Sequence, residues 1–145
     1  MEAPPMLYEY VIVCDIPAQT VLSNIRLTLH PVLKYGVTDH TNRAFWLDHL
    51  PSFFTRSCSP EMTEEDRARF LSLTIEERMH WGERWSLSNW LFWLTAGERQ
   101  WFWWNAQILD QTTLKIQLIV TDEPFAKGSF IWLIQACGGR MSEES

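Results

Sequence analysis

The sequence predicts an α+β fold: a small mixed or antiparallel sheet, built from an N-terminal strand and a C-terminal β-hairpin, with several short helices packed on it. Two stretches supply the sheet. Residues 6–14 are rich in β-branched and aromatic side chains, and residues 101–121 alternate like a hairpin. Helix-start signals recur between them, and the order strand, helices, hairpin, helix favours helices on one face of a sheet.

Length and composition indicate one domain over residues 1–145, with frayed ends at 1–5 and 140–145. Nine tryptophans should make aromatic area the main part of the core. No run approaches the ~18 apolar residues that a membrane-spanning helix needs, and the N-terminus lacks the pattern of a signal peptide. Cys14, Cys58 and Cys137 include no close pair, which favours reduced thiols in a cytoplasmic protein.

The run from Met6 to Cys14 is predicted to be a central strand because its apolar character is nearly continuous. Pro17 closes it and suits the first turn of a helix. Residues 17–33 fit two patterns. Helical spacing relates Val21, Leu22 and Ile25, whereas strand alternation relates Ile25, Leu27 and Leu29. We expect a short helix followed by an extended piece that stops at Pro31.

Short helices are predicted for the middle of the chain. Residues 35–43 read as a loop, and residues 44–54 as one or two helical turns broken near Pro51. Thr63 with Asp66 marks a helix start, and Thr74 marks another. We expect two antiparallel helices with an acidic outer face. The side chains that the first should bury are Phe70, Leu71 and Leu73.

A third helix, capped by Ser86 or Ser88, is apolar around its whole circumference and should be buried on several sides. We expect it to lie between the sheet and the acidic helices, burying Trp90, Leu91, Trp93 and Leu94. A final helix should begin near Phe125 or Ser129 and end at Gly138-Gly139. It should bury Phe130, Ile131, Leu133 and Ile134, and the tail after it should be disordered.

The hairpin has two different faces. Asp110-Gln111-Thr112 is the expected loop, and one register places a single set of residues on the core face. The pairs are Ile108 with Leu114, Ala106 with Ile116, Trp104 with Leu118, and Phe102 with Val120. The opposite face is polar near the turn but carries Trp101, Trp103 and Ile119 at its open end. Either a helix of the same chain or a partner should cover that end.

The net charge of −6 and the pI near 5.1 argue against nucleic-acid binding, which depends mainly on Lys and Arg. An acidic protein favours basic partners, because opposite charge accelerates their encounter. The alternative is that the charge simply keeps a tryptophan-rich protein soluble. The acidic doublets Glu64-Glu65 and Glu76-Glu77 mark the helix starts of this surface.

The sequence contains no recognisable catalytic, cofactor or metal motif. The doublets do not form a carboxylate dyad, since neighbouring residues on a helix point in different directions. No two histidines have the spacing that brings ligands to one helix face. A metal site would need Asp39, His40, Asp48 and His49 to converge. Cys58 is the thiol in the most exposed context, but no base is evident beside it.

We therefore expect a non-catalytic protein-binding domain, most specifically an inhibitor of the bacterial immunity-protein type that neutralises a basic toxin or effector. The alternative is an adaptor or chaperone that holds a hydrophobic segment of a secreted or structural protein, and the third hypothesis is a small enzyme. Tryptophan is typical of interface hot spots, which favours the open end of the hairpin. The predicted contact residues are Trp101, Trp103, Ile119, Glu64, Glu65, Glu76 and Glu77.

Overall fold

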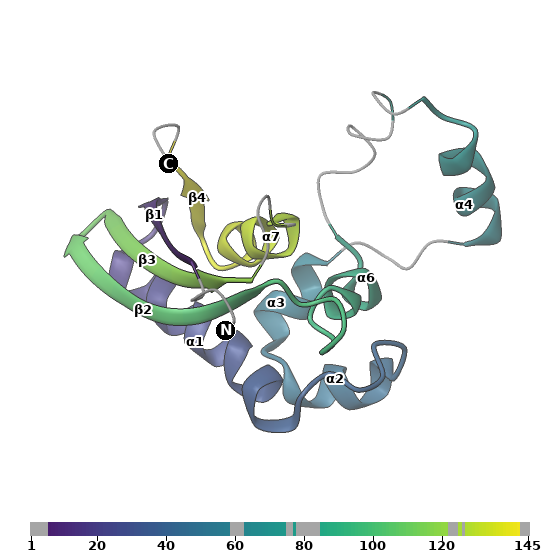
Figure 1. Cartoon of the computed structure of the whole chain (residues 1–145), viewed down its shortest axis with the longest axis horizontal. Coiled ribbons are helices and arrows are strands. Elements are labelled where there is room, and N and C mark those ends of the chain that lie inside the picture. Colours follow the sequence, from purple (N-terminus) through teal and green to yellow (C-terminus); the bar gives the residue numbers. More distant parts are fainter. Residues whose placement is uncertain are drawn as a thin grey trace, which may run out of the picture.

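The computed structural model describes residues 6–58, 63–74, 77, 85–121, 125 and 127–142, and it confirms the α+β fold. One antiparallel sheet has the strand order β2-β3-β1-β4 (Figure 1). The strands are β1 (Met6–Cys14), β2 (Trp101–Asp110), β3 (Thr113–Val120) and β4 (Gly139–Met141). The helices within the described residues are α1 (Ala18–Tyr35), α2 (Arg43–His49), α3 (Ser52–Ser57), α4 (Glu64–Leu71), α6 (Leu87–Phe92) and α7 (Gly128–Ala136).

β1 is the central strand that the sequence predicts, since it pairs with β3 on one side and β4 on the other. Its pairing with β3 aligns the apolar positions of both strands on one face. These pairs are Met6 with Val120, Tyr8 with Leu118, Tyr10 with Ile116, and Ile12 with Leu114. Helices α1 and α7 lie together on this face, and the side chain of Asn24 on α1 donates to the carbonyl of Cys137, 3.1 Å away, at the end of α7.

The β2–β3 hairpin has the predicted register only near its turn. The predicted pairs that occur are Ile108 with Leu114 and Ala106 with Ile116. Between Trp103 and Asn105 the register shifts, because Trp104 is an extra residue without a partner on β3. The pairs beyond this bulge are Trp103 with Leu118, Phe102 with Ile119, and Trp101 with Val120.

The bulge exchanges the two faces at the open end of the hairpin. The prediction that Trp104 belongs to the core is wrong, because its exposed fraction is 60%. The prediction that Trp101 and Trp103 face outward is also wrong: Trp101 is 1% exposed, and Trp103 is half-buried against the core. One inserted residue turns every later side chain to the opposite face. Phe102, predicted for the core, consequently lies beside Ile119 on the outer side of the sheet.

α1 is one continuous helix, so the extended piece predicted before Pro31 does not form. Helical spacing continues through the segment, and its buried apolar side chains include Val21, Leu22, Ile25, Leu29 and Val32. Leu27, which fits the strand alternation, is 58% exposed. Pro31 lies inside the helix, and Gly36 ends it with a φ of +69°, a conformation that glycine adopts without steric cost.

The short helices α2, α3 and α6 form close to where the sequence predicts them. Asn42 caps α2, Pro51 separates α2 from α3, and Ser86 caps α6 through the backbone N–H of Asn89. Figure 1 shows all three gathered near the C-terminal end of α1. The rings of Phe54 and Trp90 join α3 to α6, with centroids 4.5 Å apart. Trp93 is only half-buried.

Helix α4 has the predicted start without the predicted burial. Thr63 and Asp66 form a capping box, and Thr74 and Glu77 exchange the same two hydrogen bonds. No residue of α4 is buried, and Leu71 is 62% exposed; Phe70 and Leu73 are half-buried. Five of the eight residues are charged, which leaves no apolar stripe to pack. Figure 1 shows α4 apart from the sheet, with α6 on the side of the sheet towards α4. The rest of the second predicted helix, Glu76 included, lies outside the described residues.

α7 begins and ends where the sequence predicts. Its burial differs from the prediction at two positions, because Trp132 is buried and Ile131, which the sequence predicts to be buried, is half-buried. Gly138 has a φ of +103° and turns the chain into β4. The predicted disorder is therefore wrong for Arg140 and Met141, which pair with β1. This pairing needs a glycine at 139, because a Cβ there would approach Cγ2 of Ile12 to 2.8 Å.

Candidate functional site

Helices pack on only one face of the sheet within the described residues. α1 and α7 cover that face, and no described helix covers the opposite face, which we call the outer face. Three apolar side chains form a row across the outer face, because Ile119 pairs with both Leu7 and Phe102. Leu7 is 50% exposed, while Ile119 and Phe102 are half-buried. We call Leu7, Ile119 and Phe102 the apolar row.

The outer face becomes polar towards the hairpin turn. The next row consists of Glu9, Gln117 and Asn105, and Nε2 of Gln117 donates to Oε1 of Glu9 across 2.7 Å. Lys115 occupies the following row, between Val11 and Gln107. An apolar open end and a polar turn end are what the sequence predicts for this face. The bulge at Trp104 changes which aromatic residue is present there.

Trp104 is the one tryptophan among the described residues that lies mostly in water. It is the unpaired residue of the bulge on β2, an edge strand. Exposed tryptophan is uncommon in folded proteins and enriched in interface hot spots. Trp104 and the apolar row together are the candidate binding surface.

Arg99 adjoins this surface just before β2. Its Nε donates to the carbonyl of Trp101 across 2.9 Å, and its Cζ lies 4.5 Å from the ring centroid of Phe102. Nη2 is buried and has no hydrogen-bond acceptor among the described residues. Burial lowers the pKa of this guanidinium, because a low dielectric disfavours the charged form.

The predicted contact residues do not form one site. Ile119 lies in the apolar row, whereas the burial of Trp101 excludes it from an exposed contact. Glu64 and Glu65 are exposed in the first turn of α4, and Glu77 is exposed after Thr74. In Figure 1 α4 lies away from the sheet, so the carboxylates of Glu64 and Glu65 are separate from the outer face.

Sequence reasoning missed Leu7, Phe102, Trp104 and Arg99. Residues 101–104 read WFWW, and a run of four aromatic residues does not show which positions face the core. No feature of the sequence marks the bulge. Arg99 lies just before the predicted hairpin, where an arginine gives no signal of its own.

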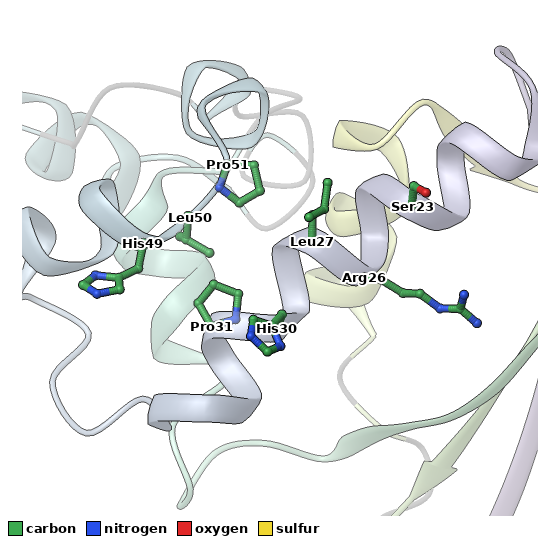
Figure 2. A pocket seen from close by; sticks show the side chains of 8 residues that line it. All are labelled: Ser23, Arg26, Leu27, His30, Pro31, His49, Leu50 and Pro51. Carbon is green, nitrogen blue, oxygen red and sulfur yellow. The ribbon is translucent and has the colours of Figure 1, made fainter.

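A groove of about 640 Å³ lies between α1 and the α2–α3 corner (Figure 2). Its apolar lining consists of Leu27, Pro31, Leu50 and Pro51. In Figure 2 the side chains of Arg26 and His49 extend away from each other. The ring of His49 stacks on Phe45, with centroids 4.1 Å apart, and its Nδ1 lies 2.7 Å from the Phe45 carbonyl oxygen. The polar groups of this groove therefore do not converge on a common point.

Several of the residues weighed for metal binding and catalysis make local structural contacts. Asp39 accepts hydrogen bonds from the hydroxyl and from the backbone N–H of Thr41, and these bonds lower the pKa of its carboxyl. His40 packs edge-on against Phe92. Within the described residues, no group of three or more His, Cys, Asp or Glu is placed to hold a metal ion. No disulfide joins Cys14, Cys58 and Cys137, all of which the structure describes.

Comparison with known proteins finds no matching family model, curated protein or solved structure. Among the described helices, none is both long and apolar enough to span a membrane. The outer face is therefore the feature from which a function is inferred.

Proposed function

We propose that this protein is a non-catalytic protein-binding domain, and specifically an inhibitor of the bacterial immunity-protein type that neutralises a toxin or effector by direct binding. The observation that carries the proposal is the apolar row on a sheet face without described helix cover. Covering such side chains removes apolar area from water, which is the main driving force of association. Trp104 adds a large aromatic anchor at the margin of this face.

The partner packs on the face of the sheet rather than extending it as a fifth strand. β2 is an edge strand, and bulges at Trp104 and Leu109 interrupt it. Arg99 also occupies the carbonyl of Trp101 at its start. Bulges and charged side chains on an edge discourage strand addition. The outer face has no comparable obstacle among the described residues.

Long-range electrostatics favour a basic toxin or effector. The described residues carry equal numbers of acidic and basic side chains, so the net charge of −6 belongs to segments outside them. The charge supports faster encounter rather than any particular contact. Affinity in this proposal depends on the apolar row and Trp104.

The proposal is tested by capture from cells of the source organism with three baits: the wild type, Leu7→Ser with Trp104→Ala, and Leu33→Ser. Leu33 is a matched control because it is 58% exposed on α1. We expect one partner to be retained by the wild type and Leu33→Ser and lost by the outer-face variant, although all three melt alike. A partner retained equally by all three would exclude the outer face.

The function of a captured partner decides the class of binder. An inhibitor must suppress the partner's toxicity on co-expression and must bind its folded domain. A toxin or effector encoded by the neighbouring gene is the first candidate. An adaptor or chaperone would instead protect a short partner fragment from limited proteolysis. Recovery of such a fragment, without inhibition, would replace the inhibitor proposal.

A further inference from the structure

Arg99 is the one charged residue among the described residues that has a buried side-chain nitrogen without a hydrogen-bond partner. Its side chain is half-buried, Nε is bonded to the Trp101 carbonyl, and Nη2 is buried without an acceptor among the described residues. The rings of Phe102 and Trp101 lie 4.5 and 5.7 Å from Cζ. Aromatic faces stabilise a cation, but they do not accept the hydrogen bonds of its Nη groups.

The described outer face offers no carboxylate for this arginine. Glu9 is the one acidic side chain in its first three rows, and Gln117 already donates to it. Lys115, two rows from Phe102, adds a second cation. These three rows and the adjoining Arg99 thus carry two cations and one carboxylate, although the whole chain is acidic.

A buried donor without an acceptor is costly, and a carboxylate on a guanidinium is among the strongest pairings available to it. The ring of Phe102 is half-buried on the outer face, beside Ile119, and lies 4.5 Å from Cζ of Arg99. A partner that covers the apolar row would also remove water from Arg99, and this strengthens any pairing there.

We infer that the partner presents an Asp or Glu side chain to Arg99 while an apolar neighbour of that residue packs on the apolar row. This inference rests on the proposed function and names the chemistry of the contact. It is compatible with a basic partner, because net charge governs encounter at long range and one carboxylate governs contact at short range.

The test titrates the isotope-labelled full chain with the capped tripeptide Leu-Asp-Leu and with its neutral counterpart Leu-Asn-Leu. The readouts are the arginine Nε–H signals and the methyl signals of Leu7 and Ile119. We expect the Asp peptide to bind about tenfold more tightly than the Asn peptide, the ratio given by one charge-assisted hydrogen bond. The Nε–H signal of Arg99 should shift, and that of the exposed Arg26 should not.

Two variants separate a binding role from a structural one. Arg99→Met should bind both peptides equally, whereas Arg26→Met should retain the preference for the Asp peptide. If Arg99→Met does not fold, the comparison of the two peptides on the wild type still decides. Equal binding of both peptides to the wild type, or no response of Arg99, would overturn the carboxylate inference. The proposed function is decided separately, by the capture experiment with the Leu7 and Trp104 variants.

Discussion

The indole N–H of Trp101 donates to Oγ of Ser129 across 2.9 Å, and this buried bond joins β2 to α7. The carbonyl of Ser129 accepts a second indole N–H, from Trp90 on α6, at 3.0 Å. Ser129 is 2% exposed, so neither tryptophan has water as a substitute partner there. One small polar residue thereby satisfies two buried tryptophans from different elements.

Ser129→Ala should destabilise the protein by about 1–3 kcal/mol, because the indole of Trp101 would remain buried without an acceptor. The bond from Trp90 should persist, since it uses the backbone carbonyl. Urea unfolding measures the difference, with Ser23→Ala on the exposed side of α1 as the control. A loss no larger than that of Ser23→Ala would contradict a structural role for the hydroxyl.

The bulge predicts opposite effects for two tryptophans three residues apart. Trp101→Ala should cost about 3–5 kcal/mol, as expected for a fully buried aromatic side chain, and should unfold a marginal domain. Trp104→Ala should change stability by less than about 0.5 kcal/mol. Thermal melts of the two variants decide the register of the hairpin. The reverse order of stability would restore the register without a bulge.

Trp104 should matter for binding instead. If it anchors the partner, Trp104→Ala should weaken the complex by at least ~2 kcal/mol, the threshold for an interface hot spot. Calorimetric titration of the captured partner measures this loss. Leu109→Ala is the control, because Leu109 is an exposed apolar residue at the second bulge of the same strand. Equal losses in both variants would assign the contact to the edge of β2 rather than to Trp104.

The acidic charge predicts a salt-dependent encounter with a basic partner. Association should slow as ionic strength rises beyond ~0.1 M, where charges are screened over ~10 Å, while dissociation changes much less. Glu64→Gln with Glu65→Gln should reduce this dependence if α4 contributes to steering. Association rates that are flat in salt would show that the charge only keeps the protein soluble.

The buried Cys137 predicts a loss of stability at high pH. Burial raises the pKa of its thiol from 9.0 to about 12, against a weaker opposing effect of the Thr28 hydroxyl. Above pH 9 the unfolded chain loses this proton and the folded chain keeps it, so stability falls with rising pH. The limiting slope is about 1.4 kcal/mol per pH unit. Urea unfolding of Cys137→Ala across this window should show a shallower decline; an identical decline would assign the effect to other groups.

Local chemistry in the sequence determined most of the secondary structure. The β-branched run of β1 predicted a central strand, and the side chains of Thr63 and Ser86 predicted helix starts that form as capping hydrogen bonds. Proline and glycine marked the boundaries at Pro51 and Gly138. These signals act between residues a few positions apart, so the sequence carries them without reference to the rest of the fold.

The tertiary structure decided which aromatic side chains of β2 face the core, because no local pattern in the sequence contains that choice. The four aromatic residues of WFWW satisfy either face of a strand, and only their packing against Ser129 and Phe130 on α7 selects Trp101 for the core. The same choice produces the bulge, exposes Trp104 and brings Phe102 to the outer face. Long-range contacts fix the register of the hairpin, because burying one large side chain leaves its neighbour exposed. Which of the two is buried depends on how it packs against the helix that covers the sheet.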